Sequence, residues 1–210
     1  MKTLIVTGGN VDVNFLKTNL EENEYDNIIA VDKGLEALDT LNIKPTETIG
    51  DFDSIRPEIL NKYKNNIITL NKEKDYTDTH MALKIAIDNN ASDITIIGGI
   101  GSRLDHTIAN VHILKIALDK NIPCKIINEN NKVFLIKEKT NLKKDEKFQY
   151  ISLIPLTTKC TGITLEGLKY TLKDETLNIG ESIGISNEQI EKEATIDVKE
   201  GILIIIYSKD

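Results

Sequence analysis

Four aspartates of this sequence could bind a metal ion together. Asp51 and Asp53 follow a short apolar run, and Asp75 and Asp78 lie where a helix is expected to start. The first two would point to the same side of an extended turn, and the second two would share a helix face. Four carboxylates at one edge of a sheet repel one another unless a cation lies among them. Oxygen ligands of this kind suit Mg²⁺, which completes its shell with water and substrate phosphates, so the pattern predicts a magnesium site.

Each aspartate taken alone also has a structural explanation. Asp53 could cap a short helix begun by Arg56 and Pro57, and Asp78 could simply lie favourably at a helix N-terminus. The metal interpretation depends on the aspartates following successive strands, because ligands bind at the carboxyl ends of strands in open α/β sheets.

A glycine-rich loop, residues 98–106, is the second candidate site. Its glycines would let backbone amides approach an anion closely. Of the 26 lysines and arginines only two are arginines, and one of them, Arg103, lies in this loop. Guanidinium binds phosphate through two parallel hydrogen bonds, which an ammonium group cannot do. The loop therefore predicts phosphate binding, with a surface arginine beside a helix cap formed by Asp105 as the alternative.

A third junction, Asp32-Lys33-Gly34, follows another apolar run. Together with Gly8 and Gly9 after the first run, Asp32 weakly resembles the acid that holds a ribose in dinucleotide-binding sheets. Neither a Gly-x-x-x-x-Gly-Lys-Ser/Thr loop nor a Gly-x-Ser-x-Gly turn is present, so P-loop chemistry and that form of acyl transfer are excluded.

The elements that must position these residues form two regions. Residues 1–128 alternate apolar runs with segments of helical period, which predicts an α/β domain with a mostly parallel sheet. Helices are expected over 77–89, with Thr77 or Asp75 as N-cap, and over 105–120. The candidate strands are Thr3–Thr7, Asn27–Val31, Glu47–Ile49, Ile67–Leu70, Ile94–Ile97 and Cys124–Asn128.

Residues 129–210 contain short, often alternating apolar runs separated by glycines, which predicts an all-β sandwich or barrel. One short helix is expected at Glu188–Glu191. The candidate strands are Val133–Ile136, Phe148–Leu153, Ile163–Leu165, Leu168–Leu172, Ala194–Val198 and Ile202–Tyr207.

Composition limits the partners. The net charge of −7 and the pI near 5.1 argue against nucleic acid. The longest aliphatic run, Ile202–Ile206, is too short to cross a bilayer, and no signal peptide is evident, so we expect no membrane association. Cys124 and Cys160 have no neighbours at metal-ligand spacing, which favours a reduced, cytoplasmic protein.

Three motifs, taken in order, resemble the thiamine pyrophosphokinase (thiamine diphosphokinase) family. They are Gly50–Ile55, Lys74–Asp78 followed by Ala82 and Leu83, and Gly98–His106 followed by Asn110. The resemblance continues in the β region, at Gly167–Tyr170 and Gly184–Glu188. Order, spacing and length fit nearly the whole chain.

This resemblance implies a catalytic, ATP-binding α/β domain over 1–128, a thiamine-binding β-sandwich over 129–210, and a homodimer with active sites between subunits. The implied reaction converts ATP and thiamine to AMP and thiamine diphosphate with Mg²⁺. By position the resemblance assigns catalytic and metal-binding roles to Asp51, Asp53, Asp75 and Asp78, nucleotide contacts to Asp32, Gly34, Gly99, Gly101, Arg103, Asp105 and His106, and thiamine contacts to Ser186 and Asn187.

The sequence departs from the family pattern at a few positions. Lys33 and Ser102 each stand where the pattern has a glycine. The chain has no tryptophan, so stacking on the pyrimidine ring of thiamine would fall to Tyr170 or to aliphatic side chains.

Three other interpretations stay open at this point. One is a pyrophosphokinase for another hydroxymethyl substrate, such as a pterin. The second is a metal-dependent phosphoester hydrolase, because aspartate clusters next to an Asp-His pair also serve that chemistry. The third is a non-catalytic sensor of a nucleotide or of thiamine.

Overall fold

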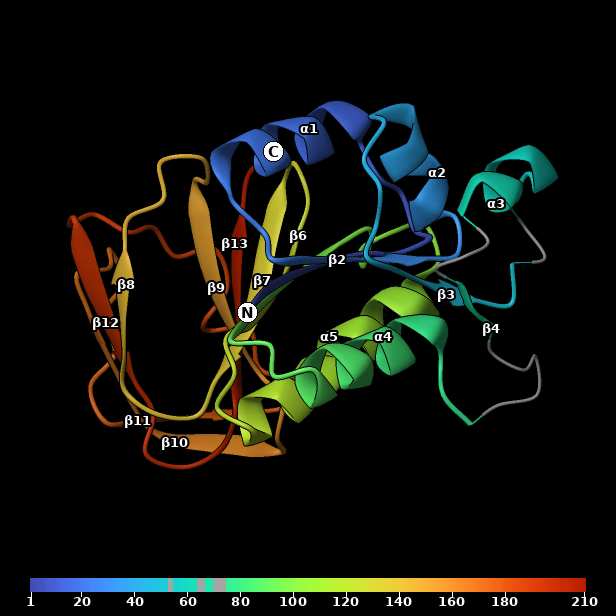
Figure 1. Cartoon of the computed structure of the whole chain (residues 1–210). Helices are drawn as coiled ribbons and strands as arrows, with labels where there is room; N and C mark the ends of the chain where they lie inside the picture. The colour runs from blue at the N-terminus through green and yellow to red at the C-terminus, as the bar shows by residue number, and fades with distance from the viewer. Residues whose placement is uncertain (53–54, 64–66, 70–74) are drawn as a thin grey trace. The chain divides into compact units, whose positions relative to one another are not determined.

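The computed structural model describes residues 1–52, 55–63, 67–69 and 75–210 (Figure 1). The chain divides into two compact units, Met1–Glu129 and Asn130–Asp210. This division lies one residue from the boundary expected after Asn128.

The first unit is built on a parallel sheet. Its strands are β1 (Lys2–Val6), β2 (Asn27–Val31), β3 (Glu47–Gly50), β4 (Ile67–Thr69), β5 (Asp93–Ile97) and β6 (Cys124–Ile127). They lie in the order β4-β3-β2-β1-β5-β6, and every described pair is parallel. The chain thus runs outward from β1 in one direction and then returns to continue on its other side with β5. The predicted α/β class is confirmed.

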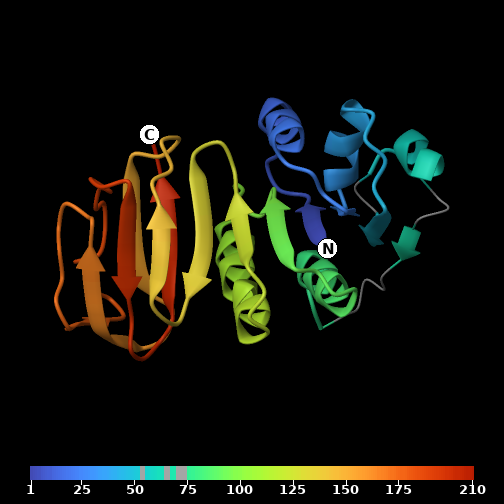
Figure 2. The same cartoon turned by 60° about the vertical axis from the view of Figure 1, so that its left-hand side comes forward.

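Helices cover both faces of this sheet. They are α1 (Val13–Glu22), α2 (Gly34–Thr40), α3 (Pro57–Tyr63), α4 (Asp78–Asp88) and α5 (Leu104–Asp119). Figures 1 and 2 show α1 and α2 on one face and α4 and α5 on the other. Side chains of a strand alternate between faces, so Leu4 and Val6 join the core under α1 and α2, while Ile5 points to the face of α4.

The second unit is a β-sandwich. Its strands are β7 (Asn131–Ile136), β8 (Thr140–Lys143), β9 (Tyr150–Pro155), β10 (Lys159–Glu166), β11 (Glu175–Asn178), β12 (Glu193–Asp197) and β13 (Leu203–Ser208). Within this unit β7, β13 and β9 pair antiparallel, and a separate antiparallel sheet has the order β11-β10-β12-β8. One hydrophobic core contains residues of both sheets, including Ile163, Ile196 and Ile205.

Two expectations in this unit are wrong. Residues Leu168–Leu172 do not form a strand, and Glu188–Glu191 do not form a helix. Instead the two segments pair with each other through an isolated bridge between Leu168 and Gln189 and a backbone hydrogen bond of 2.9 Å from Lys169 to Glu188. This pairing provides hydrogen-bond partners for backbone N–H and C=O groups that would have none within a one-turn helix.

Two short strands were not expected from the sequence. β8 and β11 each bury a single apolar side chain, Leu142 and Leu177, among polar neighbours. Such segments show too little alternation of apolar and polar residues to be recognised as strands from the sequence. None of the described helices is both long enough and apolar enough to cross a membrane.

Candidate active site

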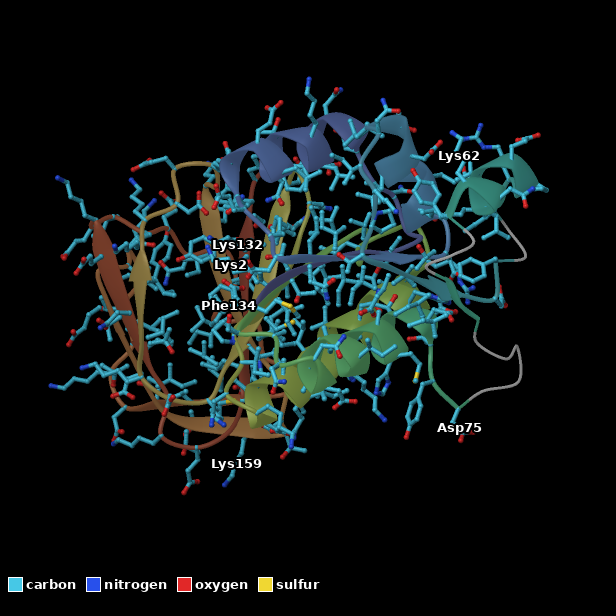
Figure 3. The ribbon with its side chains drawn as sticks, viewed as in Figure 1. Lys2, Lys62, Asp75, Lys132, Phe134 and Lys159 are labelled. Atoms are coloured by element: carbon cyan, nitrogen blue, oxygen red, sulfur yellow. The ribbon has the colours of Figure 1, made fainter. Side chains whose placement is uncertain are left out.

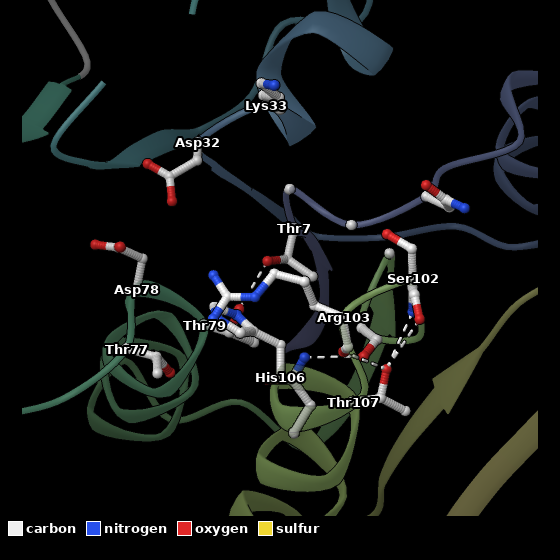
Figure 4. Close-up of a pocket in the computed structure, with 17 residues that line it drawn as sticks. Thr7, Asp32, Lys33, Thr77, Asp78, Thr79, Ser102, Arg103, His106 and Thr107 are labelled. Atoms are coloured by element: carbon white, nitrogen blue, oxygen red, sulfur yellow. Dashed lines mark hydrogen bonds between the residues drawn. The ribbon is translucent and has the colours of Figure 1, made fainter. Parts of the chain in front are cut away.

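A cavity of about 430 Å³ lies at the carboxyl ends of β1, β2 and β5 (Figure 4). This is the position where the strand order turns back between β1 and β5, and open α/β sheets bind their ligands at such a position. Its lining residues are Thr7, Gly8, Gly9, Asn10, Asp32, Lys33, Thr77, Asp78, Thr79, Gly98, Gly99, Gly101, Ser102, Arg103, His106, Thr107 and Asn110.

Two glycine loops meet in this cavity, one after β1 and one after β5. Gly98 has a φ of +82°, and a Cβ placed there would lie 2.4 Å from the carbonyl oxygen of Thr7. A Cβ on Gly9 would lie 2.1 Å from the carbonyl oxygen of Gly98. No larger residue fits either position, so the glycines are required for the two backbones to approach each other.

Helix α5 fixes the second glycine loop through two polar side chains. The backbone N–H of Gly101 donates to the hydroxyl of Thr107 over 3.2 Å, and the side-chain amide of Asn110 donates to the carbonyl of Gly99 over 2.8 Å. Thr107 and Asn110 line the cavity, and neither was assigned a role from the sequence. Asn110 could have been found from its spacing from the glycine loop, because this spacing places it on the inner face of the helix that follows the loop.

Positive charge in the cavity comes from two residues among those that line it, Lys33 and Arg103. Arg103 donates to both carboxylate oxygens of Asp105, over 3.2 and 2.6 Å. This hydrogen bond and the charge of its partner raise the pKa of Arg103, and the hydrogen bond from Arg103 is the main reason that the pKa of Asp105 is lowered. Both side chains are well exposed, so the pair can exchange with an incoming anion at little cost.

Two carboxylates, Asp32 and Asp78, extend into the same part of the cavity in Figure 4. Asp32 follows β2 with a φ of +46°, an uncommon conformation for a residue other than glycine, and its N–H donates to Ile49. Asp78 begins α4, whose N-cap hydroxyl, from Thr77, accepts from the N–H of His80 over 3.2 Å. Mg²⁺ is bound by one or two carboxylates with water and phosphate, so this pair fits a magnesium ion.

The second unit contains a separate group of candidate residues. They lie in or next to the two paired segments described above, Leu168–Leu172 and Glu188–Glu191, which we call the loop pair. Ser186 is exposed and has a φ of +55°, and its N–H donates to the hydroxyl of Ser152 over 3.0 Å. Asn187 is only 4% exposed; its oxygen accepts from the N–H groups of Tyr170 and Glu188, and its amide donates to the carbonyl of Tyr170. Asn187 therefore shapes the loop that presents Ser186 and the 59% exposed ring of Tyr170.

Comparison with known proteins identifies the family. Residues 18–126 match the family described as "Thiamin pyrophosphokinase, catalytic domain", and residues 139–203 match "Thiamin pyrophosphokinase, vitamin B1 binding domain". A curated relative, the thiamine pyrophosphokinase of Bacillus subtilis (strain 168), is 35% identical over 186 residues, which cover 87% of each chain. The chain belongs to the thiamine pyrophosphokinase family.

Solved structures of the family have the same fold. The crystal structure of thiamine pyrophosphokinase from Bacillus subtilis superposes with a TM-score of 0.90 at 31% identity, covering 100% of both chains. That of thiamin pyrophosphokinase from Geobacillus thermodenitrificans gives 0.87 at 30% identity and covers 100% of this chain and 98% of the other. The resemblance seen in the motifs is confirmed, and with it the assignment of the chain as a transferase of this family.

The structure brings together some of the site residues predicted from this family and not others. Those lining the cavity are Asp32, Asp78, Gly99, Gly101, Arg103 and His106. Gly34 is buried in the first turn of α2, and neither it nor Asp105 lines the cavity. Four further polar residues line the cavity without a binding role predicted from the sequence: Thr7, Asn10 and Thr79, which lie outside the charged motifs, and Thr77, which was expected only to cap a helix.

The four aspartates assigned to the metal have different surroundings. Asp51 follows β3 without lining the cavity, and Asp53 lies outside the described residues. Asp75 is exposed on the segment that leads into α4, and Figure 3 labels it there. Because α4 begins only at Asp78, the helix face expected to be shared with Asp75 does not form. In the described part of the chain, no three acidic, histidine or cysteine side chains are grouped so that they could hold a metal ion.

Proposed function

We propose that the chain transfers the pyrophosphoryl group of ATP to the hydroxyl group of thiamine and releases AMP and thiamine diphosphate. The observation that carries this proposal is the cavity at the β1/β5 switch point, where two glycine loops, two cations and two carboxylates lie together. Its chemistry fits a charged triphosphate, and the family to which the chain belongs acts on thiamine. Residues 1–128 would form the catalytic, ATP-binding domain and residues 129–210 the thiamine-binding domain.

The phosphates would lie against the glycine loops. The backbone at Gly99 and Gly101 carries no side chain and lets the phosphates approach closely, and Arg103 and Lys33 would neutralise their charge. Arg103 would exchange Asp105 for a phosphate oxygen. His106, which lines the same cavity, is proposed as a further nucleotide contact.

Asp78 would hold Mg²⁺. Asp32, assigned from the sequence to the nucleotide alone, faces the same space and is the second carboxylate available to the ion. When bound, the ion would offset negative charge that builds up on the phosphates during transfer. The roles predicted for Asp51, Asp53 and Asp75 stay predictions.

In the reaction, the hydroxyl oxygen of thiamine attacks the β-phosphorus of ATP. A new P–O bond forms, the bond from the β-phosphorus to the oxygen shared with the α-phosphorus breaks, and AMP leaves with that oxygen. Whichever of Asp32 and Asp78 the metal ion leaves free would accept the hydroxyl proton. Most of the acceleration would come from alignment of the two reactants and from neutralisation of the phosphates by Arg103 and Lys33.

Thiamine would bind to the Ser186 loop of the second unit, where Tyr170 offers an exposed aromatic surface for stacking on the pyrimidine ring. Asn187 would orient this loop. We also propose a homodimer with active sites between subunits; its support is the exposed apolar side chains of Ile179, Ile183 and Ile190. The free thiols of Cys124 and Cys160 suit the cytoplasm proposed as its location.

Product analysis tests the reaction directly. The protein is incubated with ATP, Mg²⁺ and thiamine, and the products are identified by chromatography and phosphorus NMR. AMP and thiamine diphosphate in equal amounts support the proposal. Phosphate release that does not depend on thiamine indicates a hydrolase, AMP formation only with a hydroxymethylpterin indicates the other pyrophosphokinase, and binding without turnover indicates a sensor.

A substitution at Asp78 tests the site. Asp78→Asn removes one charge from the carboxylate pair and should lower turnover at least about a hundredfold, which corresponds to about 2.7 kcal/mol of barrier. Asp88→Asn, the same change at the exposed far end of α4, is the control and should keep turnover. Near-normal turnover in Asp78→Asn contradicts the assignment.

A further inference from the structure

Two buried hydroxyl groups, those of Thr7 and Thr79, form a hydrogen bond in the wall of the cavity. Neither residue belongs to the motifs identified from the sequence. We propose that Thr79 is a positioning residue for the transfer reaction: through its hydrogen bond to Thr7 it holds the first turn of α4, and with it the carboxylate of Asp78, at the end of β1. This inference rests on the proposed role of Asp78. It adds two residues that neither the charged motifs nor the glycine loops include.

The bond joins residues far apart in the chain. The hydroxyl oxygens of Thr7 and Thr79 are 2.7 Å apart, the usual length of an O–H···O bond, and 72 positions separate the two residues. Thr7 is 5% exposed and Thr79 is 7% exposed. A hydroxyl buried to this degree costs free energy unless it is hydrogen-bonded, so the two groups keep each other at a fixed distance and direction.

Thr7 is a firm point of attachment. Its N–H donates to the carbonyl of Ile97 over 2.9 Å, which joins it to β5 as well as to β1. Its own carbonyl lies so close to Gly98 that a Cβ there would be 2.4 Å away. Both glycine loops are therefore fixed relative to Thr7, and a side chain bonded to Thr7 is fixed relative to the expected phosphate site.

The start of α4 needs such an attachment. The buried apolar side chains that hold this helix on the sheet are Ala82, Leu83 and Ala86, all at least one turn beyond Asp78. Thr79 is the first buried residue of α4, and it is polar. Apolar packing thus fixes the body of the helix, while the Thr7–Thr79 bond fixes the turn that carries Asp78.

Valine and serine substitutions separate positioning from stability. Thr79→Val keeps the shape and removes the hydroxyl, leaving that of Thr7 buried without its partner, so we expect a lower Tm and a kcat reduced about tenfold, with the KM for ATP changed by less than about threefold. Thr79→Ser keeps the hydroxyl and should restore most of the lost kcat. Replacing both residues, Thr7→Val with Thr79→Val, leaves no unpaired hydroxyl, so the Tm should recover while kcat stays low.

A threonine on β1, the strand that Thr7 follows, provides the control. The hydroxyl of Thr3 is fully buried and has no hydrogen-bond partner within the part of the chain that the structure describes. Thr3→Val should therefore keep kcat and keep or raise the Tm.

A second readout does not depend on turnover. Crystal structures of the wild type and the double valine variant should differ in the position of the Asp78 carboxylate by about 1 Å, a displacement large enough to affect a group at a reacting centre. An unmoved Asp78, a double variant with wild-type kcat, or a Thr79→Ser variant as slow as Thr79→Val overturns the inference. Absence of thiamine diphosphate formation by the wild type would instead overturn the proposed function, and the position of Asp78 would still test the pair.

Discussion

Two glycines assigned to nucleotide binding from the sequence, Gly34 and Gly101, have different surroundings, and alanine should act differently at each. Gly34 lies in the first turn of α2, where the helix crosses the end of β1. A Cβ on Gly34 would be 2.0 Å from the carbonyl oxygen of Val6 and 2.5 Å from its carbonyl carbon. Both atoms belong to the backbone of the central strand, so no side-chain rotation can relieve the contact.

The cost of Gly34→Ala can be worked from this geometry. The helix must move at least about 1 Å away from β1, which loosens the buried side chains of Leu35 and Leu38. Overpacking of this kind costs about 1 to 3 kcal/mol or more, and the better helix propensity of alanine returns less than about 1 kcal/mol. We expect a net loss of about 1 to 2 kcal/mol, and a Tm lower by about 5 °C or more for a unit of this size.

Gly101→Ala should have the opposite effect: it should weaken ATP binding and leave the stability of the fold nearly unchanged. The nearest atom to its Cβ would be the backbone nitrogen of Asn10, at 3.4 Å, which is ordinary van der Waals contact. The added methyl group would narrow the space between the two glycine loops, where the phosphates are expected. The Tm should stay within about 2 °C of wild type, while the KM for ATP rises about tenfold.

Circular dichroism at 222 nm follows the melting of the first unit, since all the described helices belong to it. Melting curves are recorded without nucleotide, and the KM for ATP is measured well below the melting transition. A Gly34→Ala variant with wild-type Tm and a raised KM for ATP would refute this reasoning and favour direct nucleotide contact at Gly34.

Three further substitutions test the remaining contacts. Arg103→Met should raise the KM for ATP at least about tenfold and leave the Tm unchanged, because the exposed ion pair adds little stability; an unchanged KM speaks against phosphate binding. Asn110→Leu removes the donor to Gly99 and should lower the Tm and raise the KM for ATP together, as melting and steady-state kinetics will show. Burial acts to raise the pKa of Asp145, but the hydrogen bond and charge of Lys132 outweigh it and lower this pKa below its ordinary value of 3.8. The pair then stabilises the fold above that value and loses its effect as the pH falls through the lowered pKa, so Lys132→Met should reduce the Tm at pH 7, and the difference from wild type should shrink toward pH 3.

The strands of the first unit could be predicted because each is a run of apolar, often β-branched residues bounded by polar ones. Asn27–Val31 is predicted and observed with the same bounds. In the second unit, prediction failed at segments whose pairing partner is remote, as at Leu168 and Gln189. Their conformation depends on hydrogen bonds across the loop pair, which local composition does not encode.

In the candidate site, too, some residues could be found from the local sequence and others only from contacts between remote segments. Asp78 and Arg103 could be found from the sequence, because charged residues after strands are conspicuous and the topology gathers strand ends at one edge. Asp75 could not be distinguished from Asp78, since a difference of three residues in the start of α4 decides whether the two share a helix face. Thr7 and Thr79 carry no charge and lie 72 residues apart, so only the folded chain reveals that they touch.

The sequence alone determined the α/β and β-sandwich architecture, the family, and the charged groups of the candidate site, because these depend on hydrophobic periodicity and on residue types that few other roles require. The tertiary structure decided which of those groups face one cavity. It brought Asp32 and Asp78 into the lining of one cavity, left Gly34 out of that lining, and joined Thr7 to Thr79. These outcomes depend on distances between chain segments that are remote in sequence, and such distances are set by packing over the whole sheet.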